Sequence, residues 1–338
     1  MKDKICVVGL GYVGLPTALI LAKYGFSVSG VDSNNKKITA LQKEVTLIED
    51  ARPILKEKIV KKNFKAYNKI NSADVFIVAV PTPLTQNHKA DLKFLKQAIR
   101  SICSVIKKDN LIVIESTIPP GTCRNIIIPI IEKNTNLKAN EDFLLAHCPE
   151  RAIPTNTVYE IIHNDRIIGG LNNLASQKTA EIYKSFVKGT LHITNDVTAE
   201  LTKLVENAYR DVNIAFANEI DLICSKLHIS SNEVINLANK HPRVDILVPG
   251  IGVGGDCINI DTLFISEIFP KNSKMIKMAR KINDLKPSSI SKQIFTLLKE
   301  IKNPEIVVAG ISYKKNVNDI RESPALKIIE LLKEKNIK

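Results

Sequence analysis

KICVVGLGYVGLPTALILAKY, residues 4 to 24, decides the fold of this 338-residue chain. Residues 4–9 form an apolar run that ends in glycine, and residues 15–24 follow with helical spacing of their apolar positions. A second apolar segment, 27–32, ends in Asp32. This order of strand, glycine turn, helix and strand is typical of one βαβ unit in a parallel sheet.

The rest of the N-terminal half repeats this alternation of apolar runs and helical segments. Its periodicity predicts an α/β fold with a Rossmann-like, doubly wound parallel sheet at the N-terminus. The further strands are expected at 75–80, 111–115, 143–148 and 166–169.

The pattern changes after the sheet. Helical periodicity runs continuously over 198–239, a Pro- and Gly-rich loop occupies 241–256, and helix resumes through 283. A new strand, glycine and helix are expected from Glu305 onward. We therefore predict an NAD-binding domain at 1–197, a helical central domain at 198–290 and an incomplete α/β domain at 291–338.

Composition narrows the class of protein. No apolar run is long enough to span a membrane, and no signal-peptide cleavage site follows the first strand, so we expect a cytoplasmic protein without a membrane partner. The net charge of +13 is spread over many segments with few aromatic residues, which argues against nucleic acid. The six cysteines lack CxxC pairs, so we expect reduced thiols and no metal site.

The glycine turn has the spacing of a dinucleotide-binding fingerprint. Gly9, Gly11 and Gly14 permit a tight turn and close approach of a pyrophosphate to the helix N-terminus. Asp32 ends the next strand and can bind both ribose hydroxyls, which favours NAD over NADP. The alternative is a glycine turn that binds no ligand.

One cysteine lies in a loop suited to covalent chemistry. Cys257 follows Gly252, Gly254 and Gly255 in PGIGVGGDCINID, and a thiol on such a loop can attack an aldehyde carbon. Asp261 falls one turn further on if a helix begins at the thiol. The alternative is a cysteine with a structural role.

Four more polar residues have positions that suit a site. Lys203 and Asn207 are four residues apart on a predicted helix and can together stabilise an oxyanion, although an exposed helix face is an equal alternative. Thr117 and Glu150 follow predicted strands at their carboxyl ends, where ligands bind in open α/β sheets but where ordinary loops also occur.

Eight blocks of the chain resemble one enzyme family, the UDP-glucose/GDP-mannose dehydrogenase family. NDRIIGG and HPRVDIL point within it to the N-acetylmannosamine branch. The blocks are GLGYVGLP (9–16), VPTP (80–83), ESTIPPGT (115–122), CPER (148–151), NDRIIGG (164–170), ELTKLVENAYRDVNIAFANE (200–219), HPRVDILVPGIGVGGDCI (241–258) and YKKNVNDIRESPA (313–325).

The resemblance implies a role for each matching residue. Cys257 is the nucleophile, Lys203 stabilises oxyanions, Asn207 and Asp261 support them, and Thr117 and Glu150 hold or activate the hydrolytic water. It implies NAD binding by Gly9, Gly11, Tyr12, Val13, Gly14, Asp32, Pro81, Thr82 and Thr117. It implies substrate binding by Glu150, Arg151, Lys203, Asn207, Arg243, Gly254, Lys314 and Arg321.

The implied reaction is a four-electron oxidation of a UDP-linked sugar at C6, with UDP-N-acetylmannosamine as substrate. UDP-N-acetylglucosamine or UDP-glucose are alternatives because a few loop contacts distinguish the sugars. The resemblance also implies a homodimer through the central helices, in which Arg243 is offered to the partner's site.

Two other classes remain open: a non-catalytic nucleotide-binding protein, and a two-electron hydroxyacid dehydrogenase, which needs no thiol loop.

The chain departs from the family pattern at three places. Asp256 precedes the thiol where relatives have His, and its charge is expected to raise the thiol pKa. Thr262 follows Asp261 where relatives have Pro. The last α/β domain stops at Lys338, which predicts an uncovered sheet edge unless another chain shields it.

Overall fold

The structure is a computed structural model that describes residues 2–153, 156–255, 257–314 and 319–337. It has two compact units, Met1–Lys203 and Leu204–Lys338, and the division falls within one long helix, α9 (Asp196–Leu227). Each unit is described by itself.

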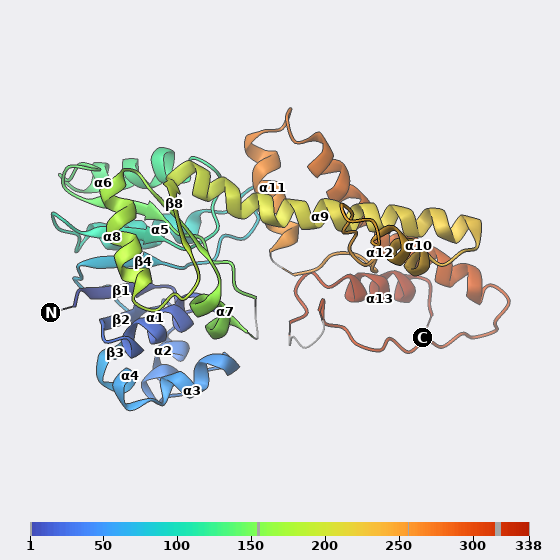
Figure 1. Cartoon of the computed structure of the whole chain (residues 1–338). Coiled ribbons are helices and arrows are strands. Elements are labelled where there is room, and N and C mark those ends of the chain that lie inside the picture. Colours follow the sequence, from blue (N-terminus) through green and yellow to red (C-terminus); the bar gives the residue numbers. More distant parts are fainter. Residues whose placement is uncertain (1, 154–155, 256, 315–318, 338) are drawn as a thin grey trace. The chain divides into compact units, whose positions relative to one another are not determined.

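The first unit is built on an eight-stranded sheet with the order β3-β2-β1-β4-β5-β6-β7-β8 (Figure 1). All neighbouring strands pair in parallel except β6 and β7, which are antiparallel. The chain order reverses between β1 and β4, so the carboxyl ends of these two strands flank the position where ligands bind in open α/β sheets. The strands are β1 Lys4–Val8, β2 Ser27–Val31, β3 Phe64–Tyr67, β4 Val75–Val78, β5 Leu111–Ile114, β6 Leu144–His147, β7 Arg166–Gly170 and β8 Leu191–Asn195.

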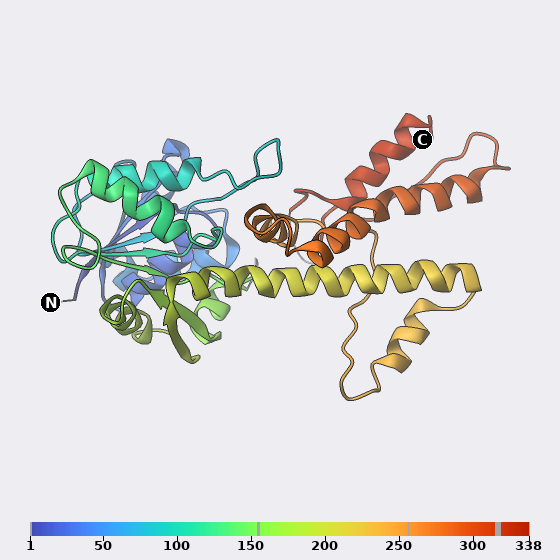
Figure 2. The same cartoon turned by 90° about the horizontal axis from the view of Figure 1, so that it is seen from above.

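Helices cover both faces of this sheet (Figure 2). Successive strand residues alternate between two apolar cores: Val7 and Ile77 belong to one, and Cys6 and Phe76 to the other. Burial on both faces explains why the central strands are continuous apolar runs. The first core includes side chains of α1 (Gly14–Lys23), α2 (Asn35–Gln42), α3 (Arg52–Leu55), α4 (Lys58–Asn63), α7 (Thr157–His163) and α8 (Asn173–Lys184); the second includes those of α5 (Lys93–Cys103), η2 (Cys123–Ile127) and α6 (Ile128–Asn134).

The expected α/β fold and doubly wound sheet are confirmed, with two strands that the sequence did not reveal. β3 is a four-residue edge strand, and β8 is mostly exposed, so neither forms the apolar run that marks a buried strand. The sheet is parallel as expected except at β7, which runs antiparallel to β6.

The second unit is helical. It contains the second part of α9, then α10 (Ser231–Ala238), α11 (Ile258–Ile268), α12 (Lys274–Leu298) and α13 (Pro324–Glu334). The expected single helix over 198–239 is wrong, because α9 ends at Leu227 and Ser230 caps a new helix by accepting a hydrogen bond from Glu233 N at 3.3 Å. Helix α12 does not stop near 283 but continues past Pro287 to Leu298, so residue 291 lies inside it.

The strand expected from Glu305 is absent from the described residues, where 304–311 has no regular structure. A strand requires a hydrogen-bonded neighbour, and this described segment does not pair with any strand of the sheet. Val307 is 93% exposed, which contradicts a buried strand at this position. The helix expected after it forms as α13. Among the described residues, no helix is both long and apolar enough to cross a membrane.

Candidate active site

The turn between β1 and α1 contains three glycines, two of which are tightly packed while the third leaves open surface. Gly9 has a φ of +95°, and a Cβ there would lie 2.4 Å from the carbonyl oxygen of Ala79. A Cβ on Gly14 would lie 1.9 Å from the carbonyl oxygen of Gly9. At Gly11, no atom of the described residues lies within 4 Å of the Cβ position. Gly9 and Gly14 are therefore required by packing, whereas Gly11 leaves room for a ligand.

This open surface faces the N-terminal end of a buried helix. Gly14 is the first residue of α1, and the preceding Val13 has no side-chain group that could cap the first N–H groups. Tyr12 is half exposed beside them. Uncapped N–H groups and the helix dipole favour a bound phosphate, so the turn fits the pyrophosphate of a dinucleotide.

Ligand-binding clefts usually have volumes of about 300 to 1,000 Å³, and one of ≈ 700 Å³ adjoins the glycine turn. Asp32 lies in it at the end of β2 and accepts hydrogen bonds from Leu10 N (3.0 Å) and from Lys37 Nζ (2.6 Å). Partial burial raises the pKa of Asp32, but hydrogen bonds from Lys37, Asn34 N and Leu10 N outweigh it and hold the pKa below its usual value. Asp32 is thus a fixed carboxylate suited to ribose hydroxyls.

The loops after β4 and β5 are tied to each other beside this cleft. Thr82 Oγ1 donates to the carbonyl oxygen of Thr117 at 2.7 Å, and Ser116 Oγ accepts from Val80 N at 2.9 Å. Pro81 lines the cleft. The structure therefore brings Thr117, Pro81 and Thr82 together with the glycine turn, as expected of a common cofactor site.

The first turns of α9 are fixed to the loop that carries Thr117. Glu200 accepts hydrogen bonds from Gly121 N (2.5 Å) and Cys123 N (2.9 Å), and Arg124 forms a two-bond ion pair with Asp196 at 2.8 Å. Asp196 and Glu200 are fully buried. Lys203 follows on the same helix and is 9% exposed. Lys203 therefore does not lie on an exposed face of the helix.

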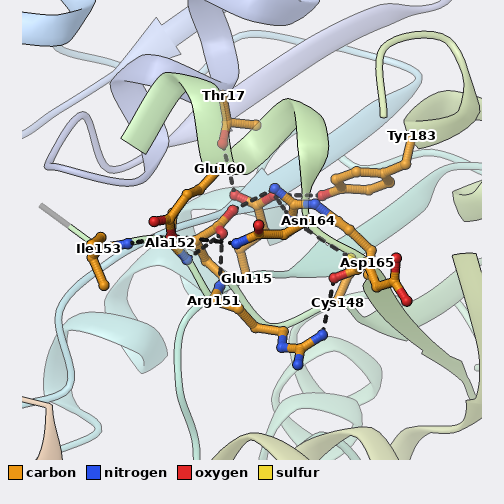
Figure 3. Close-up of polar contacts among 12 residues, drawn as sticks. Thr17, Glu115, Cys148, Arg151, Ala152, Ile153, Glu160, Asn164, Asp165 and Tyr183 are labelled. Atoms are coloured by element: carbon orange, nitrogen blue, oxygen red, sulfur yellow. Dashed lines mark hydrogen bonds and ion pairs between the residues drawn. The ribbon is translucent and has the colours of Figure 1, made fainter. Parts of the chain in front are cut away.

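A cluster of buried charged side chains includes Glu115, which directly follows β5, and Glu150, which follows β6 by three residues; Figure 3 draws the contacts of Glu115 with Thr17 and Tyr183. Arg166, on β7, forms ion pairs with Glu150 and, at 3.4 Å, with Glu115. Tyr183, on α8, donates to Glu115 at 2.6 Å, and Thr17, on α1, donates to it at 3.3 Å. The cluster thus joins the dinucleotide-binding helix to the loops that carry Thr117 and Glu150.

Both oxygens of Glu150 are engaged in this structure. Oε1 accepts from Arg151 N at 2.7 Å and Ala152 N at 2.8 Å, while Oε2 accepts from Arg166. Arg151 donates from Nη1 to the carbonyl oxygen of Asp165 at 3.0 Å. Glu150 is 8% exposed, so its conformation here is that of a fixed carboxylate that shapes its own loop.

The charge of the cluster depends on Glu115. Burial raises the pKa of Glu115 to about 7, although the charge of Arg166 lowers it and that of Glu150 raises it further. Burial also raises the pKa of the neighbouring Cys148 thiol to about 12. Glu115 therefore exchanges its proton near neutral pH, whereas Cys148 stays a neutral thiol.

In the second unit, Cys257 is the only exposed cysteine of the six, all of which are described. It is the N-cap of α11, and Asp261 N donates to its carbonyl oxygen at 2.9 Å, so the helix begins at the thiol as expected. Asn207 donates to Asp261, and both side chains are buried. Arg210 donates to the amide oxygen of Asn207. The structure therefore brings Asn207 and Asp261 together.

The glycines before the thiol permit close packing. A Cβ on Gly254 would lie 2.6 Å from Tyr313 Cβ and 2.7 Å from the carbonyl oxygen of Glu322. Gly255 N donates to the carbonyl oxygen of Arg321 at 3.1 Å. The thiol loop is thus packed against the segment that precedes α13, a contact that the sequence did not predict.

Three of the expected substrate-binding residues, Arg243, Lys314 and Arg321, are exposed. Arg243 lies in the loop after α10, Lys314 adjoins residues outside the described part, and Arg321 forms an ion pair with Asp319 at 2.6 Å.

Of the two departures from the family pattern beside the thiol, Asp256 lies outside the described residues, and with it the expected effect on the thiol pKa. Thr262 is buried and donates to the carbonyl oxygen of Ile258 at 3.0 Å. Among the described residues, no group of three His, Cys, Asp or Glu side chains could hold a metal ion.

Sequence patterns did not reveal several buried polar residues around these sites. Glu115 and Arg166 stood at the end and the start of expected strands, and Tyr183 had helical spacing with apolar neighbours. The available signal was a charged residue next to an apolar run, which also occurs at ordinary strand ends.

Sequence patterns of one protein family match three stretches of the chain. The NAD binding domain of the UDP-glucose/GDP-mannose dehydrogenase family matches residues 3–187, its central domain matches 197–285, and its UDP binding domain matches 307–338.

Individual relatives extend this similarity over almost the whole chain. The UDP-N-acetyl-D-mannosamine dehydrogenase of Methanococcus vannielii is 46% identical over 99% of this chain and 78% of its own length. The enzyme of the same name from Campylobacter jejuni is 43% identical over 99% of this chain and 84% of its own. The solved UDP-D-ManNAc dehydrogenase from Pyrococcus horikoshii superimposes with a TM-score of 0.93 at 39% identity, covering 98% of this chain and 81% of that one.

The parallel sheet, the glycine turn with open space at Gly11 and the cleft beside Asp32 define an NAD-dependent oxidoreductase. The coverage and identity of the relatives place it more narrowly. The chain belongs to the UDP-glucose/GDP-mannose dehydrogenase family, and it is a dehydrogenase of nucleotide-linked sugars.

The glycine turn yields a test of cofactor binding. Gly11→Ala should leave the thermal stability almost unchanged but weaken NAD binding at least ~10-fold, about 1.4 kcal/mol, because its methyl group fills ligand space. Gly14→Ala should instead destabilise the protein by more than about 1 kcal/mol. Calorimetric NAD titration and thermal unfolding measure both effects. Wild-type NAD affinity in Gly11→Ala would contradict this assignment of the turn.

The buried cluster yields a prediction for pH. Because the folded-state pKa of Glu115 is raised above its unfolded value, its proton contributes stability that is lost as the pH rises through about 7. Relative to Glu115→Gln, wild type should therefore lose stability between about pH 5 and 8, shifting Tm by at least ~2 °C. The exposed Glu181→Gln is the control and should show no such trend. A constant difference between wild type and Glu115→Gln would disprove the raised pKa.

Proposed function

We propose that this chain oxidises UDP-N-acetyl-D-mannosamine at C6 to UDP-N-acetyl-D-mannosaminuronate, using Cys257 as a covalent nucleophile. The observation that carries the proposal is the exposed thiol at the N-cap of α11, beside the buried Asn207–Asp261 pair. The names and the 43–46% identity of the relatives support this sugar. The same chemistry on another N-acetylhexosamine is the alternative, since relatives named NDP-N-acetyl-D-galactosaminuronic acid dehydrogenase are 39–40% identical.

Two oxidations of one carbon require a covalent step between them. The C6 alcohol loses a hydride and a proton to become an aldehyde, and the thiolate of Cys257 adds to the aldehyde carbon to give a thiohemiacetal. Loss of a second hydride and proton gives a thioester. Water then displaces the thiol to leave a carboxylate. Bound NAD supplies the chemistry by accepting one hydride in each oxidation, so two equivalents are consumed.

The protein's own residues can serve these steps. Lys203 supplies a positive charge for the oxyanions that form on C6. An amide carries two N–H donors, so Asn207 can donate both to Asp261 and to an oxyanion. Thr117 and Glu150 are proposed to hold the hydrolytic water, and Arg151, Arg243, Gly254, Lys314 and Arg321 to bind the UDP-sugar. Glu150 would have to release one of its present hydrogen bonds to do so.

The three-part division proposed from the sequence, 1–197, 198–290 and 291–338, follows the order of the three family patterns. We retain this division as a proposal: the first part binds the cofactor, the second carries the thiol chemistry and the third binds UDP. As compact units, the described residues form two groups rather than three.

Product stoichiometry tests the reaction. The purified chain with UDP-N-acetyl-D-mannosamine and excess NAD should form two NADH per uronate, measured by absorbance at about 340 nm and mass spectrometry. Cys257→Ser should lower acid formation by about 10³-fold or more. The partly buried Cys103→Ser is the control and should retain wild-type turnover. Unchanged acid formation in Cys257→Ser would eliminate the thioester route, and parallel assays with other UDP-hexoses test the choice of sugar.

We also propose that the protein is a homodimer through α9. Five large apolar side chains on this helix are 48–62% exposed, at intervals of four or seven residues that place them along one face: Val205, Tyr209, Phe216, Ile223 and Leu227. The Arg243 loop is fixed beside the same helix, because Asn213 donates to Asp245 O at 2.7 Å and accepts from Leu247 N at 2.9 Å. A second copy, pairing α9 with α9, would cover this face.

A charge on this face should separate the subunits. Phe216→Glu should weaken dimerisation at least ~100-fold, because an unpaired carboxylate would be buried in an apolar interface. Light scattering during size-exclusion chromatography measures the mass in solution. Leu174→Glu changes an equally exposed side chain on α8 and should leave the mass unchanged. A wild-type mass for Phe216→Glu would remove α9 as the interface.

A further inference from the structure

Four polar side chains are buried between α9 and α12 within the second unit. Asp211 and Asn218 lie on α9 and are both 0% exposed, while Arg280 and Asn283 lie on α12 and are 5% and 1% exposed. Their spacing, seven residues on α9 and three on α12, places each pair on one face of its helix. These positions would suit apolar side chains in a helix pair, so their polarity requires a specific explanation.

The four side chains form a continuous series of hydrogen bonds. Asn218 Nδ2 donates to Asn283 Oδ1 at 2.9 Å, and Asn283 Nδ2 donates to Asp211 Oδ1 at 2.7 Å. Arg280 Nη1 donates to the same Asp211 oxygen at 2.8 Å. We call Asn218, Asn283, Asp211 and Arg280 the polar chain.

Both ends of the polar chain bind the loop that carries the thiol. At one end, Asn218 Oδ1 accepts from Gly250 N at 2.9 Å. At the other, Arg280 Nη1 donates to Asn259 Oδ1 at 2.8 Å. Gly250 begins the glycine-rich segment, and Asn259 lies in the first turn of α11, two residues after Cys257. The polar chain therefore holds the backbone before and after the thiol.

We propose that Arg280 is a positioning residue which, through the polar chain and Asn259, holds the first turn of α11 and thereby keeps Cys257 at the N-terminus of this helix. The inference rests on the proposed function of Cys257 as nucleophile.

The chemistry of the groups explains the choice of arginine. A guanidinium is planar and rigid, so Arg280 can donate from Nη1 to both Asp211 and Asn259 while its Nε donates to Asp284 at 3.1 Å. A lysine has a single nitrogen on a flexible stem and would not hold the same acceptors in a fixed geometry. The loop also packs against Pro287 of α12 and Pro324 of α13, which lie 3.0–3.2 Å from the Cβ position of Gly252. The loop is thus constrained at Gly252 as well as at the contacts of the polar chain.

A matched pair of variants separates positioning from general stability. Asn259→Ala removes the last contact of the polar chain without leaving a buried charge, and Arg280→Lys retains the charge of α12. The control is Lys286→Met, because Lys286 is an equally buried cation of α12 whose ammonium group binds a carboxylate of α9, Asp221, at 2.6 Å, and not Asn259.

The readouts are the rate at which iodoacetamide alkylates Cys257, followed by peptide mass spectrometry over a range of pH, and steady-state kinetics. We expect Asn259→Ala and Arg280→Lys each to slow alkylation at pH 7 at least ~3-fold, because a helix N-terminus favours the thiolate. The kcat for acid formation should fall about 10-fold with an unchanged KM for NAD. Lys286→Met should match wild type in alkylation rate.

Each outcome decides between the two proposals. Wild-type alkylation in both Asn259→Ala and Arg280→Lys, or an equal effect of Lys286→Met, would overturn the positioning role. Acid formation that survives in Cys257→Ser would instead overturn the proposed function, whatever the alkylation rates. If Cys257→Ser abolishes acid formation while the Asn259 and Arg280 variants alkylate slowly, both proposals stand.

Discussion

The buried ion pairs of Arg166 with Glu115 and Glu150 are the interaction on which the first unit's site depends. Removing two carboxylates and a guanidinium from water is costly, and each needs the others and the hydroxyl groups of Tyr183 and Thr17 as partners. Because these groups come from α1, three strand ends and α8, satisfying them fixes the loops that carry the expected cofactor and water-binding residues. The arrangement adds specificity to a sheet that apolar packing already stabilises.

Helix α9 shows the same use of buried polar groups in both units. Near its start, Asp196 and Glu200 bind Arg124 and backbone N–H groups of the loop after β5. Further along, Asp211 and Asn218 begin the contacts that reach the thiol loop. In each case a buried helix side chain hydrogen-bonds to the backbone or side chains of a neighbouring segment. A single helix thus supports Thr117 in one unit and Cys257 in the other.

The features of the thiol loop agree with a reaction in which one carbon is oxidised twice. A Rossmann-type cofactor site explains hydride transfer but offers no means of carrying an aldehyde to an acid. In the proposed reaction the exposed thiol of Cys257 supplies that means. The other five cysteines are buried or partly buried, with raised pKa values for Cys6, Cys103, Cys123 and Cys148 that keep them neutral. The environment of the thiol, more than its presence, then determines its reactivity.

The sequence by itself determined the α/β fold, the NAD fingerprint and the family, because these depend on short-range order: apolar runs, glycine spacing and local blocks such as GLGYVGLP. It also placed Asp261 one turn after Cys257, since helical spacing is local. Only the tertiary structure decided that Glu150 binds Arg166, that β7 runs antiparallel, that no strand forms near Glu305, and that Arg280 reaches Asn259. These features depend on pairing between segments distant in the chain, and a single residue's type does not specify its partner.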